Sequence, residues 1–105
     1  MKVYTKLTVF EWDSGNAQKS WERHKVRVQE AEEIFENVPN LIFPDNKHSE
    51  KEKRHGIFGI TNEGRPLSGV FTMRGKKVRV ITIRDMSKKE KIFYKNYLKE
   101  VDIHE

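Results

Sequence analysis

The sequence predicts an α+β fold in which helices pack against one face of an antiparallel β-meander sheet. Residues 54–84 contain three runs of apolar and β-branched residues, separated by "EGR" and "RGKK", as expected for consecutive antiparallel strands. Residues 13–36 and 87–101 instead repeat apolar residues at helical spacing. A chain of 105 residues can bury one core, so we expect a single domain over residues 1–105.

The first two elements are a short strand and a helix. We expect the strand at Leu7–Trp12, and Asp13 or Ser14 as the N-cap of the helix that follows. One stripe of this helix consists of Ala17, Trp21 and His24. We interpret His24 as a structural residue.

A second helix is expected from about Arg27 to Glu36, because apolar residues occupy one of its faces and glutamates the other. Pro39 ends it. The segment "LIF" (41–43) is typical of a short strand, and "PDNKHSEKEKR" (44–54) of a polar loop.

The meander is expected at 54–62, 66–73 and 78–84. Its last strand, "VRVITIR", has apolar residues on both faces, which predicts an interior position in the sheet. It nevertheless contains two arginines, and a regular strand directs Arg79 and Arg84 to opposite faces unless a bulge re-aims one of them. A final helix follows, with Ser87 and Glu90 in a capping box.

The charge distribution favours binding to nucleic acid. The formal net charge is +5, and residues 74–91 alone contain eight basic and two acidic residues. Basic residues meet phosphates and nearby aromatic rings can stack on bases; the alternative is a solvated, lysine-rich helix face. The residues predicted to bind nucleic acid are Arg74, Lys76, Lys77, Lys88 and Lys89.

Two function classes are disfavoured. The absence of cysteine excludes disulfides and thiolate sites. No apolar run approaches the ~20 residues of a membrane span, so we expect a cytoplasmic protein that does not contact membranes.

Five segments, in order and spacing, resemble BrnT-type toxins, and the similarity extends from Phe10 to Tyr94. The segments are "FEWD" (10–13), "RHKV" (23–26) with "EAEEIF" (30–35), "DNKHSEKEKR" (45–54), "VFTMRG" (70–75) and "VRVITIRDMSKKEKIFY" (78–94). The family usually has a glycine where Lys25 stands. The resemblance implies a RelE-like fold and a ribonuclease toxin of a type II toxin–antitoxin pair, held in a hetero-oligomer by a BrnA-type antitoxin.

The resemblance also implies the chemistry. RelE-like ribonucleases use no metal or other cofactor: the RNA 2′-hydroxyl attacks the adjacent phosphate, and arginines stabilise the charge that develops. We therefore predict Arg54, Arg79 and Arg84 as catalytic residues, with Tyr94 supplying a hydroxyl. The alternative function is a non-catalytic module of the same fold that binds nucleic acid or protein.

Other interpretations stay open for single residues. Arg79 and Arg84 are alternatively partners in ion pairs with the acidic helix at 30–36, and Tyr94 a residue at the edge of the core. His55 is either a proton-transfer group or a surface histidine.

The polar loop contains three residues of the types that bind metals. Asp45, His48 and Glu50 lie close together in sequence. One loop with such residues is weak evidence, and we expect no metal site.

Overall fold

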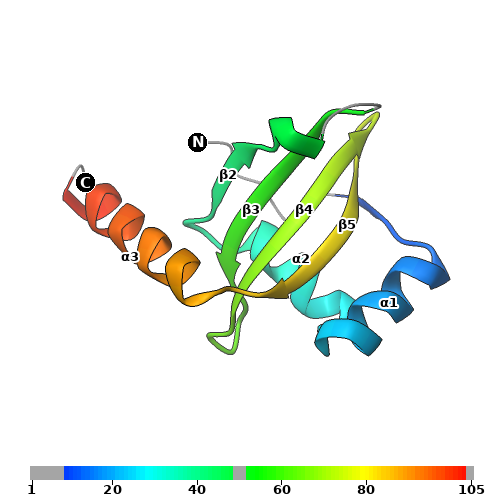
Figure 1. Cartoon of the computed structure of the whole chain (residues 1–105), viewed down its shortest axis with the longest axis horizontal. Coiled ribbons are helices and arrows are strands. Elements are labelled where there is room, and N and C mark those ends of the chain that lie inside the picture. Colours follow the sequence, from blue (N-terminus) through cyan, green and yellow to red (C-terminus); the bar gives the residue numbers. More distant parts are fainter. Residues whose placement is uncertain (1–8, 49–51, 104–105) are drawn as a thin grey trace.

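The computed structural model describes residues 9–48 and 52–103. Within them, the chain forms one five-stranded sheet with strand order β1-β5-β4-β3-β2, together with three α-helices (Figure 1). The order of elements is the predicted one. The elements are β1 (Val9–Glu11), α1 (Ser14–His24), α2 (Val28–Glu36), β2 (Leu41–Pro44), a 3-10 turn (Asn46–His48), β3 (Arg54–Ile60), β4 (Pro66–Arg74), β5 (Lys77–Asp85) and α3 (Lys88–Ile103).

The sheet is mixed, which corrects the expected antiparallel sheet. Neighbouring strands from β2 to β5 pair antiparallel, but β1 pairs in parallel with the first part of β5, with Phe10 opposite Val78. The amino-acid pattern of a short strand does not encode the direction of its partner, so sequence reasoning missed this pairing. The interior position predicted for the strand at 78–84 is confirmed, because β5 lies between β1 and β4.

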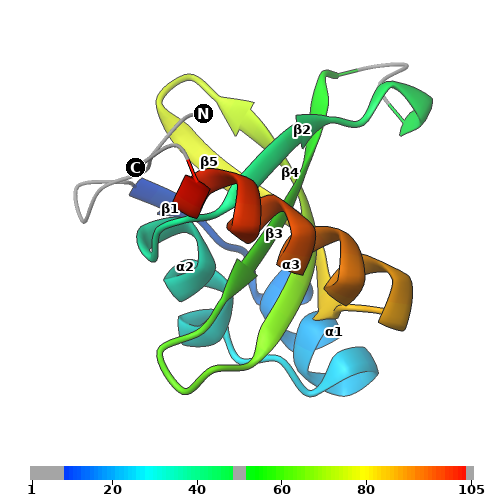
Figure 2. The ribbon, with the colours of Figure 1, turned by 90° about the vertical axis from the view of Figure 1, so that its left-hand side faces the viewer.

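Helices cover both faces of the sheet, which corrects the expectation of one covered face (Figure 2). Ile57 and Phe58 are consecutive on β3 and point to opposite faces. The back face carries Ile57 and packs against α2, whereas the front face carries Phe58, which clusters with Met86 and Tyr94 beside α3. The back-face core consists of Val26, Ala31, Ile34, Phe35, Ile57, Leu67, Phe71, Val78, Val80 and Ile83.

Helix α1 lies beside β5, where the amide nitrogen of Asn16 donates to the Val80 carbonyl at 3.1 Å. Asp13 is its N-cap, as predicted, and accepts from the Asn16 backbone at 2.7 Å. Within the stripe of Ala17, Trp21 and His24, Trp21 is 49% exposed, whereas the neighbouring Ser20 is buried.

Lys25 is the C-cap of helix α1 and adopts a left-handed conformation with φ 54°. This is the position where the resemblance places a glycine, the residue that tolerates this conformation best. Lys25 N–H donates to the Trp21 carbonyl at 2.9 Å, and its ammonium lies 5.2 Å from the centre of the Trp21 ring.

Arg65, in the turn between β3 and β4, fastens α1 to the end of β5. Its guanidinium donates to both carboxylate oxygens of Asp85, at 2.7 and 3.1 Å, and to those of Glu30, at 3.3 and 3.2 Å. It also donates to the backbone carbonyls of His24 and Lys25, at 3.1 and 2.9 Å. The Arg65 side chain thus joins the β3–β4 turn to the end of α1, to α2 and to the end of β5.

The predicted capping box at the start of α3 is confirmed. The Glu90 backbone donates to the Ser87 hydroxyl at 3.2 Å, and the Ser87 backbone donates to the Glu90 carboxylate at 2.7 Å. Among the helices of the described residues, none combines the length and the apolar character that a membrane span requires.

Candidate functional site

A β-bulge in the middle of β5 brings its two arginines onto one face of the sheet. Val80 pairs with Phe71 of β4, but Thr82 pairs with the adjacent Val70, so Ile81 is an extra residue. Arg79 therefore lies opposite Thr72 and Arg84 opposite Ser68, and these two β4 residues share a face because their spacing is even. Both arginines belong to the front face.

Arg54 lies on the same face. It is opposite Thr72 on β4, and Thr72 is opposite Arg79 on β5, so the three residues form one row across three strands. Two strand spacings separate Arg54 from Arg79, which is roughly 10 Å. Two guanidiniums on long side chains can converge over that distance.

The row continues toward the turn between β4 and β5, where further basic residues gather. Arg74 and Lys77 are paired across this turn on the front face, and both are exposed, as is Lys76. Arg74 approaches Glu11 of β1 at 3.9 Å, a weak exposed contact. Three of the residues predicted to bind RNA therefore extend the arginine row.

Arg79 is held by the residue that caps α1. Its Nη2 donates to the Asp13 carboxylate at 2.7 Å. The hydrogen bond from the Asn16 backbone, together with Arg79, lowers the pKa of Asp13, and Asp13 raises the pKa of Arg79. The Arg79 guanidinium therefore stays charged, and its direction is fixed. The bond to Asp13 uses Nη2, so the guanidinium has further N–H groups that can donate to a ligand.

Arg84 makes a two-pronged ion pair with Glu90. Nη1 and Nη2 donate to the two Glu90 carboxylate oxygens at 2.7 and 3.0 Å, and Nη1 also donates to the Asp85 carbonyl at 3.0 Å. Arg84 lowers the pKa of Glu90, and Glu90 raises the pKa of Arg84. Arg84 thus has more of its donors engaged than Arg79.

The acids that pair with these arginines lie outside the helix that sequence reasoning named. They are Asp13 and Glu90, whereas Glu30 of α2 pairs with Arg65. The alternative of ion pairing is therefore correct in kind and wrong in partner, because the sequence does not show that α2 lies behind the sheet.

Tyr94 lies in the front-face cluster beside Phe58 and is buried. Its hydroxyl donates to the Pro39 carbonyl at 2.6 Å, and burial raises its pKa. This environment fits a residue at the edge of the core, with its hydroxyl committed to the backbone.

The two histidines with described side chains lie in different places. His55 follows Arg54 on β3 and points to the back face, where its ring stacks on Phe71 with centroids 5.3 Å apart. His24 instead lines a small cleft of about 120 Å³ between α1 and β5. The interpretation of His55 as a proton-transfer group on the arginine row therefore has no geometric support.

The α1–β5 cleft adds basic residues that sequence reasoning passed over. Lys19, Arg23 and His24 line it from α1, and the bulged Ile81 and Thr82 line it from β5. The spacing of Lys19 and Arg23 places both on one helix side, and this was the available signal. Nothing local in the sequence shows that this side meets β5.

A metal site of at least three histidine or acidic ligands is not found among the described residues. Of the residues considered for one, Glu50 and the side chain of His48 lie outside the described part of the chain.

Residues 12–90 match a family model described as "Ribonuclease toxin, BrnT, of type II toxin-antitoxin system". No curated protein matches the chain.

Proposed function

Since the chain belongs to the BrnT family of type II toxin–antitoxin ribonuclease toxins, we propose that it cleaves RNA without a metal, on the front face of its sheet. The observation that carries this proposal is the bulge at Ile81, which puts Arg79 and Arg84 on the face that Arg54 shares. A regular strand would send one of them into the back-face core.

In the proposed reaction, the RNA 2′-hydroxyl attacks the adjacent phosphorus and the bond to the 5′-oxygen of the next nucleotide breaks. The products are a 2′,3′-cyclic phosphate and a 5′-hydroxyl, and one proton moves from the 2′-oxygen to the leaving oxygen. Negative charge develops on the non-bridging phosphate oxygens, which bidentate arginines stabilise well.

Arg79 and Arg54 are our candidates for direct contact with the scissile phosphate. Arg79 has its direction fixed by Asp13 and still has donors to offer, and Arg54 lies in the same cross-strand row. Arg84 is held by Glu90 and would bind a flanking phosphate. We leave Tyr94 out of the proposed catalytic set.

The RNA backbone would extend along the basic residues on either side of the row. Arg74, Lys76 and Lys77 lie toward the β4–β5 turn, and Lys19 and Arg23 line the α1–β5 cleft.

We further propose that the whole chain is one RelE-like domain that acts in the cytoplasm and is neutralised by a BrnA-type antitoxin. The family supports a protein antitoxin and an RNA substrate. The finer assignments rest on the resemblance of the five sequence segments.

The test is cleavage of RNA by the purified chain in excess EDTA, with analysis of the product ends. We expect 2′,3′-cyclic or 3′-phosphate ends and no cleavage of RNA that is 2′-O-methylated at the cleaved position. Arg79→Ala should slow cleavage by about a hundredfold, because it removes a transition-state contact worth roughly 2–4 kcal/mol. Arg27→Ala, at an exposed position at the start of α2, should cleave normally.

Two results would count against the proposal. A requirement for Mg²⁺ with 5′-phosphate products would indicate a metal-activated water as nucleophile. RNA binding without cleavage would favour the non-catalytic module, a reading that the ion pairs of Arg79 and Arg84 also allow.

A further inference from the structure

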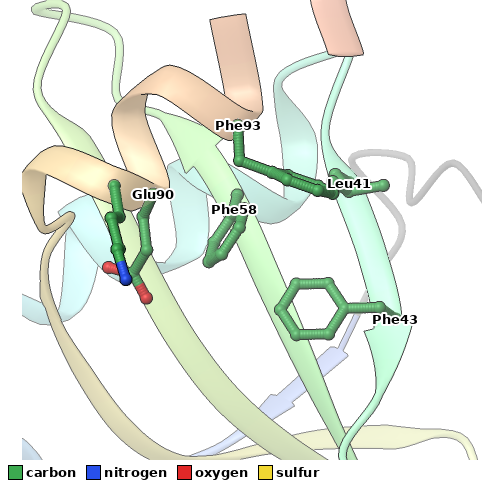
Figure 3. A pocket seen from close by; sticks show the side chains of 6 residues that line it. Leu41, Phe43, Phe58, Glu90 and Phe93 are labelled. Carbon is green, nitrogen blue, oxygen red and sulfur yellow. The ribbon is translucent and has the colours of Figure 1, made fainter. Parts of the chain in front are cut away.

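The front face also carries an apolar groove, which the proposed cleavage does not use (Figure 3). It lies between α3 and strands β2 and β3 and has a volume of about 510 Å³. We call it the α3 groove. Its lining consists of Leu41, Phe43, Phe58 and Phe93, with Lys89 and Glu90 at the helix side.

The groove is built by close aromatic packing. The Phe43 ring lies against Gly56, and a Cβ at residue 56 would collide with that ring. Phe43 and Phe58 pack edge to face with centroids 4.9 Å apart, and Phe93 packs edge to face against Phe58 at 6.3 Å. Glycine at position 56 thus lets the ring lie over β3 and form part of the groove.

Aromatic surface in this groove is exposed to solvent. Phe93 is 60% exposed although its ring faces the groove. An exposed apolar hollow of this kind marks a binding surface. Its volume accommodates roughly two or three large apolar side chains. The lining offers few polar partners for the edges of a nucleobase, which favours apolar side chains as occupants.

The charges around the groove indicate what flanks those side chains. Glu90 is neutralised by its ion pair with Arg84, whereas Lys89 is exposed at the groove. Phe43 is opposite Gly56, and Arg54 lies two residues before Gly56 on the same face, so the Phe43 end of the groove is roughly 7 Å along β3 from the arginine row. A segment seated in the groove would therefore place its next residues beside basic side chains, where acidic groups are favoured.

We propose that the α3 groove receives a segment of the antitoxin, with apolar residues in the groove and acidic residues reaching toward Arg54 and Arg79. This proposal rests on the proposed function, because the family supplies the protein partner. Inhibition then follows from geometry: the acidic part of the segment occupies the row that the RNA phosphate would need.

The chain offers a matched pair of variants for the test. Phe93 and Ile92 are neighbours on α3 and similarly exposed, at 60% and 56%, but of the two only Phe93 lines the groove. The probe is the protein encoded by the reading frame next to this chain's gene, and its affinity for the full chain is measured by calorimetry. We expect Phe93→Ala to weaken binding about 30-fold or more, as for an interface hot spot, and Ile92→Ala to weaken it less than threefold.

A second measurement tests the overlap with RNA. A non-cleavable 2′-O-methyl RNA should compete with the antitoxin for the unmodified chain. Half-inhibition of RNA cleavage by the Phe93→Ala variant should need about 30-fold more antitoxin than half-inhibition of the unmodified chain. If RNA and antitoxin bind together, the overlap with the arginine row is refuted.

The outcomes separate this proposal from the proposed function. Equal affinities of the two variants for the antitoxin would overturn docking in the groove. Loss of RNA cleavage by Phe93→Ala with unchanged antitoxin affinity would also overturn it and identify the groove as a platform for a base. A chain that cleaves no RNA, but whose antitoxin affinity falls with Phe93→Ala, would contradict the proposed function and support the docking.

Discussion

Replacing Arg65 with methionine should destabilise the fold more than any exposed substitution. The variant keeps an unbranched apolar side chain in place of the arginine stem but removes the hydrogen bonds to Glu30, Asp85 and two carbonyls at the end of α1. Asp85 has a 59% exposed side chain, so this pair contributes at most about 1 kcal/mol. The Glu30 side chain is 12% exposed, and loss of its counter-charge costs roughly 2–3 kcal/mol.

The expected loss is therefore about 3–4 kcal/mol in the free energy of unfolding. For a domain of this size, the melting temperature falls by at least about 12 °C. Urea unfolding at pH 7, followed by circular dichroism, measures the loss. Arg27→Met is the control, because Arg27 also contacts Glu30, at 3.4 Å, but has a 58% exposed side chain and should cost less than about 1 kcal/mol. Equal losses in the two variants would show that the hydrogen bonds of Arg65 do not join α1 and α2 to the end of β5.

Three further predictions concern pH, the candidate tyrosine and the groove glycine. Burial raises the pKa of Glu30, but hydrogen bonds from the Arg27 backbone and from Arg65 outweigh it, and Arg65 lowers the pKa of Asp85. Both carboxylates thus stabilise the fold at pH values above the ordinary carboxyl pKa, and this contribution should be lost as the pH falls through their lowered pKa values. Measured against pH, the difference in the free energy of unfolding between the unmodified chain and Arg65→Met should therefore shrink in acid. Tyr94→Phe should cost about 1 kcal/mol and leave RNA cleavage within twofold, and a hundredfold loss would return its hydroxyl to the catalytic set. Gly56→Ala should cost about 1–3 kcal/mol in thermal unfolding, and no loss would show that the ring packed against it yields freely.

The sequence predicted the elements whose signals are local. The capping box of Ser87 and Glu90 and the Asp13 N-cap depend on residues within one helical turn. The interior position of β5 is also confirmed. The prediction assumed a regular strand with apolar residues on both faces, but the bulge leaves Val78, Val80 and Ile83 together on the back face.

The features that build the site depend on contacts between distant segments. The bulge at Ile81 is a property of the pairing of β5 with β4, and every residue of "VRVITIR" fits a regular strand equally well. Arg65 stands alone in a turn, and its acidic partners are 20 and 35 residues away. Sequence periodicity predicts the direction of a side chain relative to its neighbours. It does not predict which distant residue that side chain contacts.

The extra residue in β5 also sets a rule for comparing related chains. An odd spacing between Arg79 and Arg84 puts both on one side only because one residue between them is unpaired. A relative that lacks the bulged residue must carry its two basic positions four apart to keep the same surface. An alignment without a gap at this position would shift the strand by one residue and match charged positions to core positions. The bulged residue should therefore be aligned as an insertion, so that residues on the same face of the sheet are matched.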